Sequence, residues 1–124
     1  MTLLEQWLYK AEEDLGSAKY LLMGNFYGTA IYHTQQAAEK AFKSYCVYIN
    51  IPIPRTHNLD MLCQLCQSAD ADFDNIYLYA IDLNGLDIAF RYPNVDLDPT
   101  EKDVQYAIQL ASDILDFVKT KCAL

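Results

Sequence analysis

The fold of this chain is decided by the stretch His33-Thr34-Gln35-Gln36-Ala37-Ala38-Glu39-Lys40-Ala41-Phe42-Lys43. It contains no Gly or Pro and consists mostly of strong helix formers, so it predicts a long helix. One stripe of this helix is small and aromatic, and its pattern predicts a packing face made of Tyr27, Ala30, Thr34, Ala37, Ala41, Tyr45 and Tyr48. A second stripe is polar, with neighbours three or four residues apart, and consists of His33, Gln36, Lys40 and Lys43.

Helical signals extend on both sides of this stretch. A capping box at residues 2–5 predicts the start of a first helix. That helix is expected to end near Met23, because Gly24-Asn25 suits the left-handed position that follows many helices. The central helix is expected over residues 26–49, since two prolines follow closely and force an extended connection.

The second half of the chain predicts shorter helices and connections. A third helix is expected to be capped by Thr56 or Asn58 and to end at about Ser68. A fourth helix is expected over about 74–89, after a short acidic break. A loop bracketed by two prolines follows, and the capping-box pattern at residues 100–103 predicts the start of a long last helix.

Length and composition favour one folded domain over residues 1–124. Hydrophobic residues make up 52% and charged residues 21% of the chain, which is typical of a globular protein. We find no internal repeat and no period-two strand pattern. The expected fold is therefore all-α, an up-and-down bundle of about five helices.

The charge balance argues against some classes of function. A net charge of −8 with only nine Lys and Arg residues opposes general DNA binding, which depends on neutralising phosphates. The first residues lack a basic region followed by an apolar run, and no apolar stretch approaches ~20 residues. We therefore expect a cytoplasmic protein that does not span a membrane. Ten tyrosines indicate a surface for a partner.

The four cysteines include one Cys-x-x-Cys pair, Cys63 and Cys66. A zinc site needs more ligands at suitable spacing, and none accompanies this pair. Leucines surround it at helical spacing, which favours buried thiols over metal or redox chemistry. We expect no metal and no cofactor.

Several short motifs in this order resemble the HEPN domain family, which is named for a nucleotide-binding domain of higher eukaryotes and prokaryotes. The motifs are Trp7, Ala11, Asp14-Leu15 and Ala18, then His33 with the run at 35–43, then His57-Asn58-Leu59, and Arg91-Tyr92-Pro93. The resemblance implies a compact bundle of about five helices that is often a homodimer. Many members of the family are paired with a minimal nucleotidyltransferase, and several such pairs act as toxin and antitoxin.

Active members of this family are ribonucleases whose signature is an Arg, four to six residues and a His. Arg can clamp a phosphate and His can transfer a proton near neutral pH. Here Arg91 is followed by seven residues without a His, and Arg55 is followed too closely by His57. The resemblance therefore implies a branch without the usual catalytic motif, although His33 and Arg91 leave a rearranged site open.

The polar stripe of the central helix allows two interpretations. As a ligand site it would hold a phosphate or a base through Lys, Gln and His side chains, and the loop would add a guanidinium clamp and an aromatic stacking face. The residues of this candidate site are His33, Gln36, Lys40, Lys43, Arg91 and Tyr92.

The second interpretation, which we favour, is an internal polar network. Lys40 or Arg91 would pair with Asp14 or Glu39 and fix the register where the first, second and last helices meet, because a buried charge needs a partner. A ligand could still contact the rim of such a network. His57 and Pro93 are expected to shape loops.

Together these observations predict a small HEPN-like interaction or nucleotide-binding module without catalytic activity. Its expected partners are a second copy, a nucleotidyltransferase, and a nucleotide or RNA ligand. The alternative is a toxin-type ribonuclease with a rearranged active site.

Overall fold

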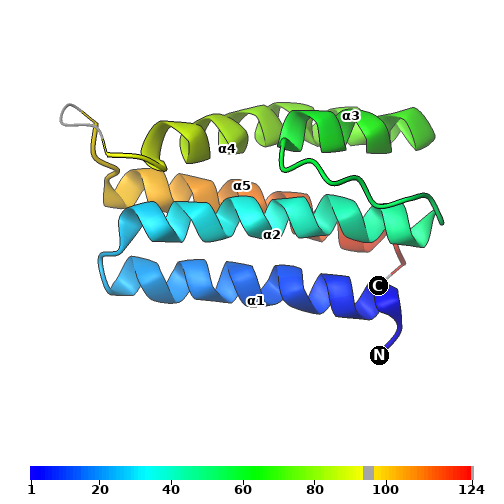
Figure 1. Cartoon of the computed structure of the whole chain (residues 1–124), viewed down its shortest axis with the longest axis horizontal. Helices are drawn as coiled ribbons and strands as arrows, with labels where there is room; N and C mark the ends of the chain where they lie inside the picture. Colours follow the sequence, from blue (N-terminus) through cyan, green and yellow to red (C-terminus); the bar gives the residue numbers. More distant parts are fainter. Residues whose placement is uncertain (94–96, 124) are drawn as a thin grey trace.

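The computed structural model describes residues 1–93 and 97–123, and within them the regular structure is helical. Figure 1 shows long helices lying side by side, with both ends of the chain at the same end of the bundle. The all-α bundle expected from the sequence is confirmed. In chain order the elements are α1 (Leu3–Met23), α2 (Tyr27–Tyr48), α3 (Leu59–Ala69), the 3₁₀ helix η1 (Ala71–Ile76), α4 (Tyr77–Phe90) and α5 (Glu101–Lys121).

Helix α2 is the centre of the bundle and contacts α1, α3, α4 and α5. Four of its alanines are completely buried, and their small side chains let the neighbouring helices approach closely. Two buried hydroxyl groups are satisfied within the helix: Thr34 donates to the Ile31 carbonyl and Ser44 donates to the Lys40 carbonyl. The stretch that predicted the central helix therefore also forms most of the core.

The helix ends follow the local signals closely. Capping boxes at Thr2 and Thr100 begin α1 and α5. Asn58 caps α3, because its side chain accepts a hydrogen bond from the backbone N–H of Met61. Thr56 does not cap the helix, since its hydroxyl accepts from the N–H of Asn58. After α1 it is Asn25 that takes the left-handed conformation, with φ of 65°.

The fourth helix begins later than its sequence pattern indicated. Residues 71–76 form a tighter 3₁₀ turn, and the α-helix starts at Tyr77. Phe73 explains the difference, because it is fully buried and its ring contacts Phe42, Tyr45 and Phe117 on two other helices. This aromatic cluster fixes the turn by tertiary packing, which a local pattern does not record. Helix α4 continues through Gly85. Of the expected loop before α5, residues 94–96 lie outside the described residues.

Candidate functional site

One cluster of charged side chains joins α1 to α2. The carboxylate of Asp14 on α1 contacts His33 Nδ1 at 3.0 Å and also binds the ammonium group of Lys40. His33 and Lys40 are seven residues apart, which is two helical turns, so both face the same side of α2. All three side chains are partly exposed. Asp14 therefore orients an imidazole and balances a cation at the rim of the bundle.

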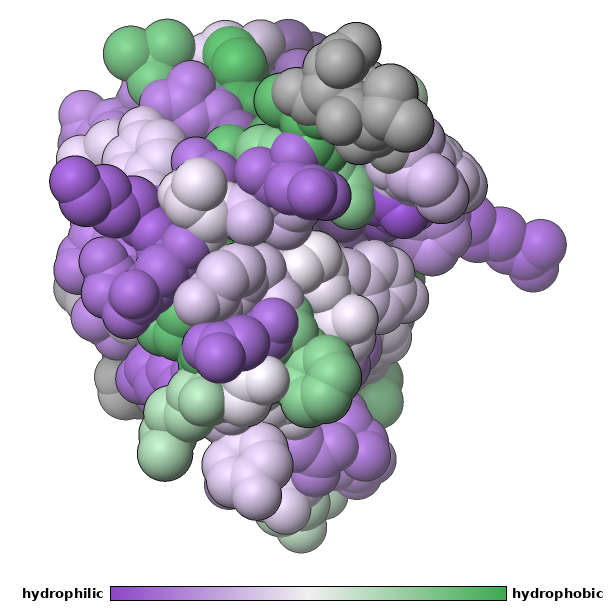
Figure 2. Space-filling view, turned by 90° about the vertical axis from the view of Figure 1, so that its left-hand side faces the viewer, coloured by the Kyte–Doolittle hydropathy of each residue, from purple (hydrophilic) through white to green (hydrophobic). Residues whose placement is uncertain are grey.

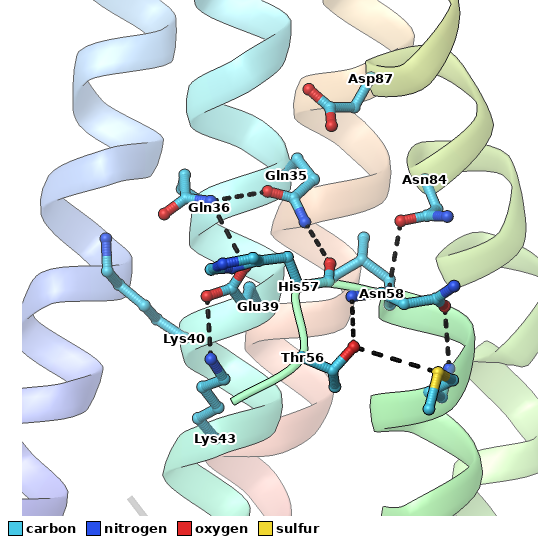
Figure 3. Close-up of polar contacts among 12 residues, drawn as sticks. Gln35, Gln36, Glu39, Lys40, Lys43, Thr56, His57, Asn58, Asn84 and Asp87 are labelled. Carbon is cyan, nitrogen blue, oxygen red and sulfur yellow. Dashed lines mark hydrogen bonds and ion pairs between the residues drawn. The ribbon is translucent and has the colours of Figure 1, made fainter. Parts of the chain in front are cut away.

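A second cluster is centred on Glu39 and is much more buried. The Glu39 side chain is only 6% exposed, and its oxygens accept from Lys43 Nζ at 3.1 Å and contact His57 Nδ1 at 2.9 Å. Gln36 lies near the same carboxylate, at 3.4 Å. Figure 3 shows these groups converging between α2 and the chain segment before α3. The contact joins His57 directly to the central helix.

Gln35 extends this cluster, although sequence reasoning had not assigned it a role. Its amide nitrogen donates to the backbone carbonyl of His57 at 2.7 Å, and its oxygen accepts from Gln36 at 2.8 Å. The side chain is almost completely buried, so its amide needs these partners. One indication in the sequence that Gln35 is buried is that it directly follows Thr34, which belongs to the predicted packing face.

Arg91 does not join Asp14 or Glu39, and that part of the expected network is wrong. Its guanidinium binds Asp87, four residues earlier, with 2.5 Å between Nη2 and Oδ2. It also lies over the Tyr32 ring, 5.4 Å from the centroid. A partner one helical turn away satisfies Arg91 locally, so it does not reach α1. Tyr92 and Pro93 next to it are exposed.

Asp87, the partner of Arg91, is the other residue of this charged network that the sequence analysis did not identify. It is buried on α4, and burial raises the pKa of its carboxyl group, while the charge of Arg91 acts in the opposite direction. The spacing of four residues before Arg91 was a signal that could have identified it. A hollow of about 340 Å³ beside Arg91 is lined by Gly28, Thr29, Tyr32 and Phe90. Figure 2 shows this end of the bundle, where hydrophilic and apolar groups are interspersed.

A larger groove of about 630 Å³ lies along the first half of α1. Its volume is within the usual range of small-molecule sites. Helix α2 contributes Lys40 to its lining, so the groove borders the Asp14 cluster. The other lining residues are Met1, Leu3, Gln6, Trp7, Tyr9 and Lys10. Two aromatic rings and two cations therefore surround one apolar hollow.

The cysteine pair lies in the core. Cys63 and Cys66 are fully buried, and burial raises the pKa of Cys63 to about 12. Within residues 1–93 and 97–123, no group of three or more His, Cys, Asp or Glu side chains is placed to hold a metal ion. None of the described helices combines the length and apolar character needed to cross a membrane.

The geometry defines a helical bundle with paired charges along its central helix, and comparisons with known proteins identify its family. The family model described as HEPN domain matches residues 4–121. The chain therefore belongs to the HEPN domain family, as its motifs indicated.

Two solved structures are similar over nearly the whole chain. One is ST0689, described as an archaeal HEPN homologue, with 32% identity and a TM-score of 0.75, covering 98% of this chain and 99% of that one. The other is TT1696 from Thermus thermophilus, with 28% identity, a TM-score of 0.79 and the same coverage.

A shorter match links the chain to a protein of Methanocaldococcus jannaschii named "Putative toxin MJ1304". The two are 45% identical over 51 residues, which is 41% of this chain and 33% of the relative. The matched part thus spans about a third of that relative's length.

Proposed function

We propose that this chain is a single-domain, cytoplasmic HEPN recognition module that binds a nucleotide or another phosphate-bearing ligand without catalysing its turnover. The observation that carries this proposal is the groove beside the Asp14 cluster, in which Trp7 and Tyr9 lie near Lys10 and Lys40. An aromatic ring can stack on a base, and an ammonium group can bind a phosphate as a point charge.

The state of the charged groups supports recognition over catalysis. Lys43 is neutralised by the buried Glu39, and Arg91 by Asp87, so these cations act first as structural groups. Neither histidine follows Arg91 within the spacing of the ribonuclease signature. Lys10 and Lys40 line the groove itself. Lys40 is also paired with Asp14, whereas the partner of Lys10 is Glu13, in a pair whose side chains are both more than half exposed, so Lys10 is the cation that a ligand can reach most easily.

Trp7 provides a direct test, because it is the only tryptophan in the chain and it lines the groove. Titration with adenine and guanine nucleotides should change its fluorescence in a saturable way. Lys10→Gln should weaken binding by about tenfold, as expected for the loss of one charged contact. Lys102→Gln on the exposed start of α5 is the matched control and should bind normally. A titration without saturation at millimolar nucleotide would refute the ligand proposal.

The family also suggests partners for the module. We propose that it forms a homodimer and acts with a minimal nucleotidyltransferase in a toxin–antitoxin pair. The toxin part of this proposal is in keeping with the name of the relative that is 45% identical to the chain over 51 residues. The neighbouring reading frame tests this proposal. If it encodes a nucleotidyltransferase, the two proteins should elute together after coexpression, and separate elution would refute the pairing.

A second candidate function, a ribonuclease with a rearranged site, is favoured by one observation. The Tyr32 ring contacts His33 edge-on, with centroids 5.5 Å apart, and also lies under Arg91. A proton carrier held by Asp14 and a guanidinium group are thus neighbours of one tyrosine.

Incubation of the pure chain with structured RNA tests this candidate. Cleavage that is lost in both His33→Ala and Arg91→Ala would establish the ribonuclease. Absence of cleavage, or cleavage that survives Arg91→Ala, would refute it and leave the recognition module.

A further inference from the structure

The carboxylate of Asp14 is shared between a histidine and a lysine. One of its oxygens contacts His33 Nδ1 at 3.0 Å, and the other binds the ammonium group of Lys40. A lysine side chain keeps its charge around neutral pH, whereas an imidazole gains a proton there as the pH falls. The cluster therefore has two charge states. With a neutral imidazole the carboxylate and ammonium charges cancel, and with a protonated imidazole one positive charge is in excess.

The contact with Asp14 determines where the added proton goes. An ionised carboxylate only accepts hydrogen bonds, so this contact places the hydrogen of the neutral His33 ring on Nδ1. The second proton, which comes from solvent, is then carried by Nε2. Once it is bound, the carboxylate of Asp14 balances two cations at the same time. The ammonium group of Lys40 is then less fully neutralised and attracts an anion more strongly.

The other charged groups around this cluster already have partners of opposite sign. On α1, Lys10 pairs with Glu13 at 3.5 Å. The Tyr32 ring contacts the imidazole edge-on, and above that ring lies the guanidinium group of Arg91, which pairs with Asp87 on α4. Each of these ion pairs is neutral as a unit. A proton on the imidazole therefore changes the net charge of the whole neighbourhood.

The apolar groove along α1 begins at this cluster. Trp7, Lys10 and Asp14 follow one another at three and four residues, so they lie along one stripe of the helix. Lys40 lines the groove from α2. Figure 3 shows its side chain extending toward α1, away from Glu39. The group whose neutralisation depends on the imidazole is therefore also a wall of the groove.

We propose that the groove takes up a proton at His33 together with its anionic ligand, so that binding becomes tighter as the pH falls from about 8 to about 6. The inference rests on the proposed function and specifies how that site is regulated. A phosphate in the groove stabilises the protonated imidazole, and by reciprocity the protonated imidazole stabilises the bound phosphate. The sign follows from the charges, because an anion favours the state with the excess positive charge.

The chain contains a second cluster of the same composition, which provides an internal control. The carboxylate of Glu39 is shared between Lys43 at 3.1 Å and His57 at 2.9 Å. The described lining of the groove includes Lys40 but none of these three residues. His33 and His57 are also the only two histidines in the sequence. Substitution of each histidine in turn therefore separates the groove from the rest of the molecule.

Titration of the full chain with cyclic AMP, followed by Trp7 fluorescence at pH 6 and pH 8, tests the inference. The phosphodiester of this nucleotide keeps its charge over this range, so a change in affinity reports on the protein. Binding should be about tenfold tighter at the lower pH, as expected when one charged contact is added. His33→Gln can still donate a hydrogen bond to Asp14 but takes up no proton, and it should bind equally at both pH values. His57→Gln, the matched control, should retain the tenfold change.

Calorimetric titration with cyclic AMP at neutral pH, in two buffers of different ionisation enthalpy, measures the proton uptake directly. The binding enthalpy should differ between the buffers for the original chain and for His57→Gln, and it should be the same in both for His33→Gln. A pH dependence that survives in His33→Gln, or that is lost in His57→Gln, would overturn the inference and leave the proposed function standing. Absence of saturable binding at both pH values would overturn the proposed nucleotide site, and the inference with it.

Discussion

Glu39 gives the sharpest test of how the charges hold this fold together. Its carboxylate is the partner of Lys43 Nζ, at 3.1 Å, and the two side chains are only 6% and 8% exposed. Glu39→Gln keeps the shape of the side chain but leaves the ammonium group of Lys43 without a counter-charge. Removal of one partner of a buried pair costs ~3–5 kcal/mol, and we expect about 3 kcal/mol because Lys43 retains slight access to water.

The same value can be expressed as a melting temperature. With an unfolding entropy of about 2.1 cal/mol/K per residue, a chain of 124 residues should lose about 12 °C. Urea unfolding followed by circular dichroism at neutral pH measures the free energy, and thermal melting measures the temperature. Both should report the same loss if unfolding is two-state.

Two variants separate this cause from a general effect of mutation. Glu13→Gln removes a pair whose side chains are more than half exposed, and it should cost less than about 0.5 kcal/mol. The double change Glu39→Gln with Lys43→Met removes both charges and should recover most of the loss. A loss below about 1 kcal/mol for Glu39→Gln alone, or no recovery in the double variant, would refute the argument.

Three further predictions concern a helix cap, two helical glycines and a buried acid. Thr100→Ala removes the capping box of α5 and should lower the free energy of unfolding in urea by about 1 kcal/mol. Gly16→Ala and Gly85→Ala, measured by urea unfolding in dilute solution, should each raise it by ~0.5–1 kcal/mol. Burial raises the pKa of Asp87 in the folded chain, so ionised Asp87 destabilises the fold as pH rises through that raised value. The difference in melting temperature between Asp87→Asn and the original chain should therefore shift in favour of the variant as the pH rises from acid to neutral. A difference that stays constant with pH would contradict this reasoning.

Local sequence patterns predict most of this fold. The central helix and both capping boxes depend on side chains within a few residues of one another, so spacing alone predicts them. For the cap of α3 the sequence offered Thr56 or Asn58, and the structure shows that it is Asn58. Local spacing does not predict where α4 begins. That position depends on the burial of Phe73 against segments that are distant in the chain.

In the candidate site, too, some contacts follow from local spacing and others depend on how the helices pack. His33 and Lys40 are two turns apart on one helix, so the sequence predicts their shared face. Asp14 was one of two expected partners for Lys40, and the structure pairs these two residues. For Arg91 the sequence analysis considered Asp14 and Glu39 as partners, but the residue pairs with Asp87, which lies four residues earlier, one helical turn away. Gln35 acquired its role because the segment before α3 lies against α2.

The sequence by itself determined where the helices lie, which faces they bury and which family the chain resembles, because periodicity, caps and motifs are local properties. Only the tertiary structure decided which charges meet and which remain at a surface. Pairing depends on how each helix is rotated against its neighbours and on where the connecting segments pass.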